Sequence, residues 1–120
     1  MTKYEKRDDD SISDLSGVQA GTTEIDIKYC KNLISLGGIE KAAETLSLLY
    51  IDQSPLLLLN GIEKCTKLQS LKLSIAGLED ILFLVQLANL QQLDLSGNKM
   101  QTAPNLSQHT QLTRLNLSKN

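Results

Sequence analysis

A pattern that recurs every 22 residues constrains the fold of this chain more than any other feature of its sequence. Leu90–Asn98 and Leu112–Asn120 both read LxxLxLxxN, where x is any residue. Steps of the same length towards the N-terminus reach Leu68–Ala76 and Leu46–Ser54, which keep the apolar positions. A fixed period of about 20 to 50 residues is typical of stacked structural units, so we expect one array of similar units.

The two halves of each unit predict different local structures. The Leu-x-Leu core of the motif alternates as a short strand does, with its apolar side chains facing inward. An irregular fifth unit around Ile25 and Ile27 keeps this alternation, and the five strands are expected near residues 24–28, 48–52, 70–74, 92–96 and 114–118. The linking halves are apolar at every third residue, as at Leu56, Leu59, Ile62 and Cys65. This period favours 3₁₀ turns over an α-helix.

The two ends of the array differ from its middle. A remnant of one linking half comes first, and we expect it to close the N-terminal end of the core: Ile12, Leu15 and Val18. Residues 1–10 are charged and are predicted to form a polar, solvated tail before a repeat domain over residues 11–120. Asn120 follows a strand directly, without a polar cap, so we expect the domain to be truncated there and to self-associate through its uncapped edge.

This pattern resembles the leucine-rich-repeat family, in particular its 22-residue class, known from a regulatory subunit of protein phosphatase 1 and from bacterial internalins. The resemblance covers about residues 12–120. It implies an α/β fold, a right-handed solenoid with a short parallel β-sheet on its concave face and 3₁₀, irregular or short helical turns on its convex face. Cys30 followed by Leu33 is similar to the cysteine-type variant of the repeat.

The residue after each strand has to turn the chain into the core. An Asn at this position can exchange hydrogen bonds with the turning backbone, which predicts a ladder from unit to unit. The ladder positions are Cys30, Ser54, Ala76, Asn98 and Asn120. Because Ala76 has no polar side-chain atom, we expect residues 74–78 to be looser or to recruit water.

Composition argues against several classes of function. A net charge of -2 and a pI near 5.3 leave no field for a polyanion, so nucleic acid is not an expected partner. No apolar stretch approaches the roughly 20 residues of a membrane span, and no signal-peptide pattern opens the chain. Cys30 and Cys65 occupy different phases of the repeat and are expected to be free thiols. We therefore expect a cytoplasmic protein without a membrane partner.

Residues suited to catalysis or metal binding are sparse. His109 is the sole histidine, and neighbouring units carry Cys65 and Leu87 at its position, so we expect it to be a partly buried structural residue. Two Cys and one His cannot form a four-ligand zinc site. The run Asp8–Asp10 lacks the glycine-bearing frame of a calcium loop. We predict no catalytic residue, no metal, no cofactor and no enzymatic activity.

The outward strand positions are where a binding site is expected, because they can vary without touching the core. Tyr50 is the only aromatic residue in the central outward columns, and Tyr is enriched at interface hot spots. We predict a concave-face site for a protein or peptide, centred on Tyr50 and made of Leu48, Tyr50, Asp52, Lys72, Ile75, Asp94 and Arg114.

The expected function is thus that of an interaction module, in a regulatory or scaffold protein. Two alternatives stay open. An internalin-type surface or adhesion protein would be favoured by a signal sequence or anchor in a longer chain. A regulatory region of an enzyme would be favoured by a catalytic domain beyond Asn120.

Overall fold

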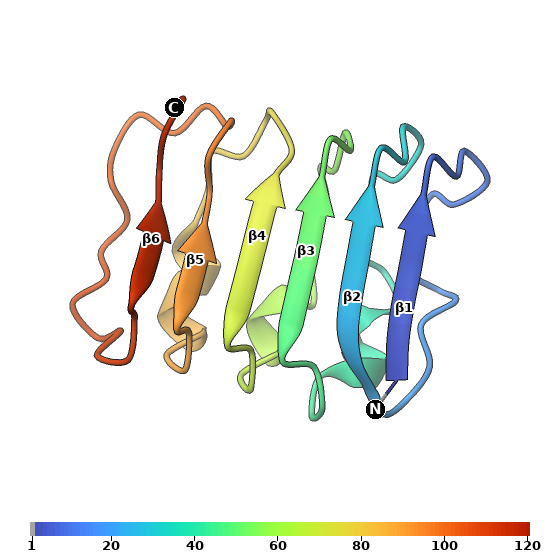
Figure 1. Cartoon of the computed structure of the whole chain (residues 1–120), viewed down its shortest axis with the longest axis horizontal. Helices are drawn as coiled ribbons and strands as arrows, with labels where there is room; N and C mark the ends of the chain where they lie inside the picture. Colours follow the sequence, from blue (N-terminus) through green and yellow to red (C-terminus); the bar gives the residue numbers. More distant parts are fainter. Residues whose placement is uncertain (1) are drawn as a thin grey trace.

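Six short strands lie side by side in chain order and form one parallel sheet (Figure 1). The computed structural model describes residues 2–120. The strands are β1 (Thr2–Arg7), β2 (Thr22–Lys28), β3 (Leu48–Asp52), β4 (Ser70–Ser74), β5 (Gln92–Asp94) and β6 (Arg114–Asn116). Parallel neighbours require the chain to return behind the sheet after every strand. This α/β arrangement of a parallel sheet with short turns is compatible with a repeat solenoid.

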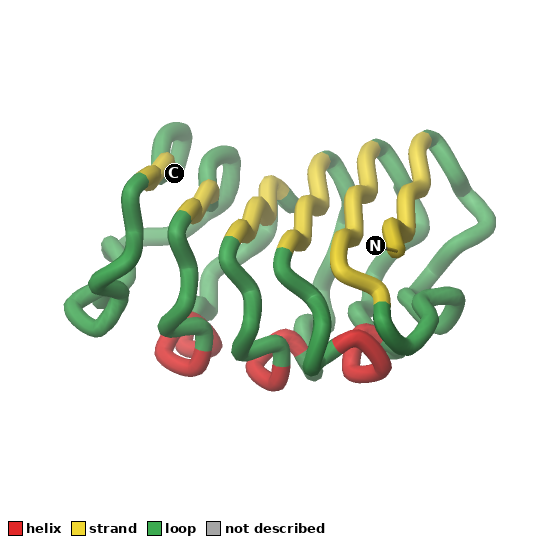
Figure 2. The backbone as a smooth tube through the Cα atoms, turned by 60° about the horizontal axis from the view of Figure 1, so that its bottom comes forward, coloured by secondary structure: helices red, strands yellow, loops and turns green. Residues whose placement is uncertain are grey.

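The linking segments lie on the opposite side of the units from the strands (Figure 2). Three of them contain a 3₁₀ helix, and these are η1 (Ile39–Ala42), η2 (Ile62–Lys64) and η3 (Leu82–Gln86). The inward residues of these helices are buried, as at Ile39, Ile62 and Leu84. The period of three therefore corresponds to tight turns with one side facing the core. No helix within residues 2–120 has the length and apolar character that crossing a membrane requires.

The core is a continuous stack of aliphatic side chains between the sheet and the linking segments. Three inner strands each contribute a pair of buried residues, and β5 contributes one, with a second directly after the strand: Ile25 and Ile27, Leu49 and Ile51, Leu71 and Leu73, Leu93 and then Leu95. Leu15 and Val18 are also buried and belong to the same cluster, at the N-terminal end of the stack. Because each unit shares its apolar surface with its neighbours, stability depends on the interfaces between units.

The predicted polar tail over residues 1–10 is wrong, because Thr2–Arg7 forms strand β1 and pairs with β2. Met1 lies outside the described residues. Tyr4 is in register with Ile25, and its ring packs against the core. Lys6 is in register with Ile27, and its Nζ lies 5.5 Å from the centre of the Tyr4 ring. A charged side chain on the inward side blunts the edge of the sheet while its stem covers apolar surface.

Both asparagines of the predicted ladder make its hydrogen bonds, whereas Ser54 Oγ is buried and has no hydrogen-bond partner within residues 2–120. Asn98 Nδ2 donates to the carbonyl of Leu73 at 2.6 Å, and Asn120 Nδ2 donates to the carbonyl of Leu95 at 2.9 Å. Cys30 Sγ takes the same place in its unit and lies 3.6 Å from the carbonyl of Lys28. The two asparagine contacts tie the turns after β5 and β6 to the backbone of the preceding unit.

The unit that contains Ala76 turns differently. The left-handed residue after the strand is Tyr29, Gln53, Gly97 or Lys119 in other units, but here it is Ala76, one residue later, with φ 68°. The shift turns Ile75 inward, where it is only 4% exposed. Ile75 was predicted to belong to the exposed binding face, and that prediction is wrong. An apolar side chain thus fills the place that a polar ladder residue takes elsewhere.

Candidate functional site

The strand register places most of the predicted site residues in rows across the uncovered face of the sheet. In one row, Asp26, Tyr50, Lys72, Asp94 and Asn116 are successive partners on β2 to β6. A second row runs through Glu24, Leu48, Ser70, Gln92 and Arg114. Neighbouring parallel strands lie about 4.8 Å apart, so side chains in one row are close enough to contact the same ligand.

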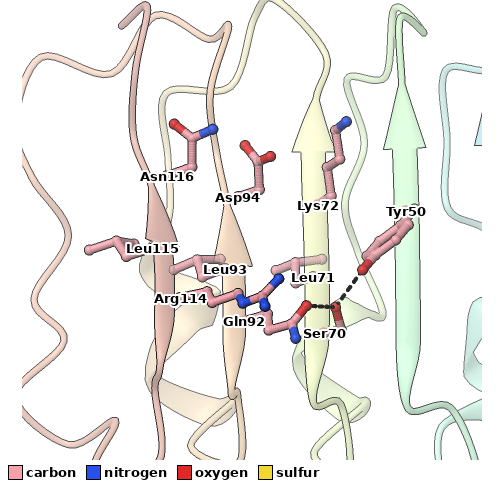
Figure 3. Close-up of a pocket in the computed structure, with 10 residues that line it drawn as sticks. All are labelled: Tyr50, Ser70, Leu71, Lys72, Gln92, Leu93, Asp94, Arg114, Leu115 and Asn116. Carbon is pink, nitrogen blue, oxygen red and sulfur yellow. Dashed lines mark hydrogen bonds between the residues drawn. The ribbon is translucent and has the colours of Figure 1, made fainter.

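A recess of about 360 Å³ lies on this face between β3 and β6 (Figure 3). Four of the seven predicted site residues line it: Tyr50, Lys72, Asp94 and Arg114. We call it the sheet recess. Its polar lining is completed by Ser70, Gln92 and Asn116, which the sequence prediction did not include. These three lie in the same outward columns, but each is a common surface residue that gave no signal of its own.

A chain of hydrogen bonds fixes the Tyr50 ring at one side of the sheet recess. The hydroxyl oxygens of Tyr50 and Ser70 are 2.9 Å apart, and Ser70 Oγ donates to Gln92 Oε1 at 3.4 Å (Figure 3). The Tyr50 hydroxyl is thus bonded to a side chain that is itself bonded to the next strand. Tyr50 is half-buried and held in place. A partner that packs on this ring need not immobilise it first, which lowers the entropic cost of binding.

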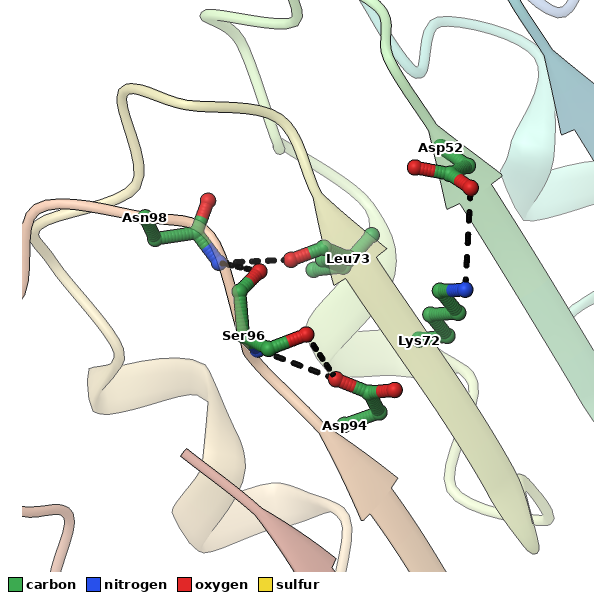
Figure 4. Close-up of polar contacts among 6 residues, drawn as sticks. All are labelled: Asp52, Lys72, Leu73, Asp94, Ser96 and Asn98. Carbon is green, nitrogen blue, oxygen red and sulfur yellow. Dashed lines mark hydrogen bonds and ion pairs between the residues drawn. The ribbon is translucent and has the colours of Figure 1, made fainter. Parts of the chain in front are cut away.

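The charged side chains around the sheet recess differ in how far they are already paired. Lys72 Nζ lies 3.6 Å from Asp52 Oδ2 (Figure 4). Asp94 Oδ1 accepts hydrogen bonds from the backbone nitrogen of Ser96 at 3.0 Å and from its hydroxyl at 2.6 Å. Arg114 is exposed and makes no ion pair within the described residues. Arg114 is therefore the cation most available to an incoming carboxylate.

Asp26 lies at the other end of the Tyr50 row and was not among the predicted site residues. Lys3 Nζ is 3.9 Å from its Oδ2, while Oδ1 is buried and has no hydrogen-bond partner among residues 2–120. A buried carboxylate oxygen without a donor costs stability, so Asp26 is an unsatisfied position in the sheet. Asp26 thus places a negative charge on β2, and Arg114 of the second row places a positive charge on β6.

The remaining predicted site residues lie at different distances from the sheet recess. Leu48 is half-buried and shares a smaller recess of about 230 Å³ with Tyr50. Asp52 does not line the sheet recess, but it forms an ion pair with Lys72, which does. Ile75 is buried in the turn after β4 and does not line the sheet recess.

The groups with chemical reactivity lie in the core instead of at the sheet recess. His109 is 6% exposed, and its Nε2 donates to the carbonyl of Leu84 at 2.8 Å. Cys30 and Cys65 are buried free thiols. Burial, reinforced by Glu63 and Glu40, raises the pKa of Cys65 to about 11, which keeps it protonated. Within residues 2–120 no three His, Cys, Asp or Glu side chains gather closely enough to hold a metal ion.

A comparison of the chain with descriptions of known protein families found no match, and a comparison with curated proteins found no similar sequence.

Proposed function

We propose that this chain is a leucine-rich-repeat protein whose uncovered sheet face binds a segment of another protein. The 22-residue period, the parallel sheet and the short 3₁₀ turns support the assignment to this repeat type. Both cysteines are free thiols, which favours a reducing compartment such as the cytoplasm. A stacked array suits recognition because its outward residues can change without altering its core.

The observation that carries the proposal is the fixed Tyr50 ring beside the sheet recess. Tyr50 combines apolar area with a hydroxyl that is already bonded to Ser70. Rigid aromatic side chains of this kind are enriched at interface hot spots, where they supply contact area at low entropic cost. The recess next to the ring offers space for a side chain of the partner.

The charges on the sheet face favour one orientation of the bound segment. Asp26 and Asp52 lie on β2 and β3, whereas the unpaired Arg114 lies on β6. A segment that crosses the strands would place a hydrogen-bond donor or cation over β2 and a carboxylate over β6. Charge complementarity of this kind sets orientation and selects among partners more than it raises affinity.

The test starts from peptides selected out of a random display library with the immobilised chain. We expect Tyr50→Ala to weaken binding of the selected peptides at least about tenfold, a loss of roughly 1.4 kcal/mol or more. Tyr50→Phe keeps the ring and should lose less. Lys64→Ala, in η2 on the opposite side, is the control and should bind as the parent does.

Peptides that bind the parent, Tyr50→Ala and Lys64→Ala equally would refute a site on the sheet face. A loss confined to Lys64→Ala would move the site to the side of the linking segments. The far-ultraviolet circular dichroism of every variant should match that of the parent, because both replaced side chains lie outside the core cluster.

A further inference from the structure

Most of the large apolar side chains that are exposed within the described residues lie on the side of the molecule that carries η2 and η3. Four of the seven large apolar side chains that are exposed within the described residues lie here, namely Leu57, Leu58, Leu82 and Val85. Leu57 is 74% exposed and Leu82 is 76% exposed. Leu82 and Val85 are three residues apart in η3, so they lie on the same side of that 3₁₀ helix. Clustered apolar exposure of this kind marks interaction sites.

Two of these side chains, Leu57 and Leu82, border a cleft between two neighbouring units. The cleft has a volume of about 360 Å³ and is lined by Leu57, Leu59, Asn60, Ile62, Glu63, Asp80, Leu82 and Phe83. We call it the linking-side cleft. A second recess of about 210 Å³ adjoins it, shares Leu57, Leu59 and Asp80 with it, and adds Glu79. The two together form a depression in which leucine side chains alternate with carboxylates.

The charge around the linking-side cleft is of one sign. Glu63, Glu79 and Asp80 line the two recesses, and no Lys or Arg does. Glu63 Oε2 accepts from the backbone nitrogen of Gly61 at 3.0 Å, and Asp80 Oδ1 accepts from that of Leu82 at 3.0 Å. Within residues 2–120 none of the three carboxylates is in an ion pair. Each retains an oxygen for a cation supplied from outside.

We propose that the linking-side cleft binds a short amphipathic segment of another protein, whose apolar side chains are flanked by Lys or Arg. Leu57 and Leu82 contact the apolar side of this segment, and Glu63, Glu79 and Asp80 pair with its cations. An amphipathic helix laid into an apolar groove is a recurrent mode of peptide recognition. This surface is separate from the sheet recess and does not depend on it.

Charge complementarity disfavours two other occupants. In a symmetric dimer across this surface, the carboxylates of one copy would face the same carboxylates of the other, since a two-fold interface joins identical patches. An anionic lipid surface would likewise be repelled by Glu63, Glu79 and Asp80, because peripheral proteins bind such membranes through Lys and Arg. A segment that carries positive charge encounters neither penalty.

Two synthetic peptides of about 14 residues, four helical turns, test the proposal. Both carry Leu at positions i, i+3, i+4 and i+7, and the flanking positions are Lys in one peptide and Glu in the other. Binding of each labelled peptide to the whole chain is followed by fluorescence anisotropy. We expect the Lys peptide to bind at least about tenfold more tightly than the Glu peptide, and this ratio to fall as salt is added.

Variants of the chain locate the site of binding. Leu57→Ser combined with Leu82→Ser should weaken the Lys peptide at least about tenfold, whereas Ile34→Ser changes an exposed apolar residue that lines neither the cleft nor the sheet recess and should not. Glu63→Gln combined with Glu79→Gln keeps an acceptor for the Gly61 nitrogen but should reduce the preference for the Lys peptide severalfold. Tyr50→Ala should leave both peptides unaffected, which separates this site from the sheet recess.

Several results would overturn the proposal. Equal binding of the two peptides would remove the role of the carboxylates, and an equal loss in Ile34→Ser would remove the role of the cleft. A dimer in sedimentation velocity that the Leu57 and Leu82 changes dissociate would assign the cleft to a second copy of this chain. Flotation with phosphatidylserine vesicles that the same changes abolish would assign it to a membrane surface.

Discussion

The side-chain amide of Asn98 bridges two neighbouring units, because its Oδ1 accepts from the backbone nitrogen of Ile75 at 3.1 Å while its Nδ2 donates to carbonyls on both sides. These carbonyls are those of Leu73 at 2.6 Å and Leu95 at 2.8 Å (Figure 4 shows the contact with Leu73). Asn98 is buried, so solvent cannot take over these bonds. One amide thus satisfies backbone groups that the turns would otherwise leave unpaired.

Asn98→Ala should lower the free energy of unfolding by about 3 kcal/mol, because several buried backbone groups lose their partner and each costs roughly 1 to 3 kcal/mol. Asn120→Ala is the matched control. Asn120 donates to Leu95 and Leu117 in the same way but is exposed, so water can replace it and the loss should be about 1 kcal/mol or less. Urea denaturation of both variants measures the difference, and equal losses would contradict the bridging role.

Ala76→Gly should stabilise the chain by about 0.5 to 1 kcal/mol. The left-handed conformation of Ala76, at φ 68°, costs an L-residue roughly 1 to 2 kcal/mol that Gly does not incur, and the extra freedom of Gly in the unfolded chain offsets part of this gain. Gly97→Ala is the reverse change at φ 71° in the next unit, where the new Cβ would lie 2.8 Å from Ser74 Oγ. It should be destabilising, and the urea midpoints of the two variants should move in opposite directions.

Leu71→Ala should lower the free energy of unfolding by about 2 to 5 kcal/mol, the range found when a buried Leu is truncated. Leu71 is 1% exposed and lies in register between Leu49 and Leu93, so its loss opens a cavity at two interfaces between units. The cooperative unit that melts should extend beyond its own repeat. Thermal melting monitored by circular dichroism checks this, and a midpoint equal to that of the parent would mean that the side chain is not in the core.

Elements that follow the repeat could be predicted from the sequence, whereas those that depart from it could not. The alternation in Leu71-Lys-Leu73 appears in the structure as β4, with Lys72 on the outer side. Strand β1 was missed because the segment TKYEKR has only one strongly apolar residue, Tyr4, and reads as solvated by composition. Its strand conformation depends on pairing with β2, which no local pattern reports.

The residues of the candidate sites could likewise be predicted where they follow the repeat, and could not where they depart from it. Tyr50, Lys72, Asp94 and Arg114 could be brought together from the sequence because a constant period fixes which residues are neighbours across strands. Ile75 could not be placed, since a turn that starts one residue later reverses the direction of a side chain. The sequence does contain one signal for the linking-side cleft. The run Leu56–Leu59 holds more consecutive leucines than a period of three can bury, so some of them must be exposed.

The two outer strands of the sheet are protected to different degrees, and this predicts how the 120-residue chain associates. On β1 the inward Lys6 opposes stacking of another apolar unit. On β6 the inward Leu115 is 48% exposed beside a strand that pairs only with β5 in the described residues. An unpaired parallel edge next to apolar surface is a template for association.

We therefore expect the chain of residues 1–120 to self-associate through β6, with an average mass that rises over a concentration series in static light scattering. Leu115→Lys should reduce the association, because it gives β6 the inward charge that β1 already has and stacking would bury that charge without a partner. Lys6→Leu should increase it by opening the opposite end. A parent chain that stays monomeric at high concentration, or association that Leu115→Lys leaves unchanged, would show that the edge of β6 is not the contact.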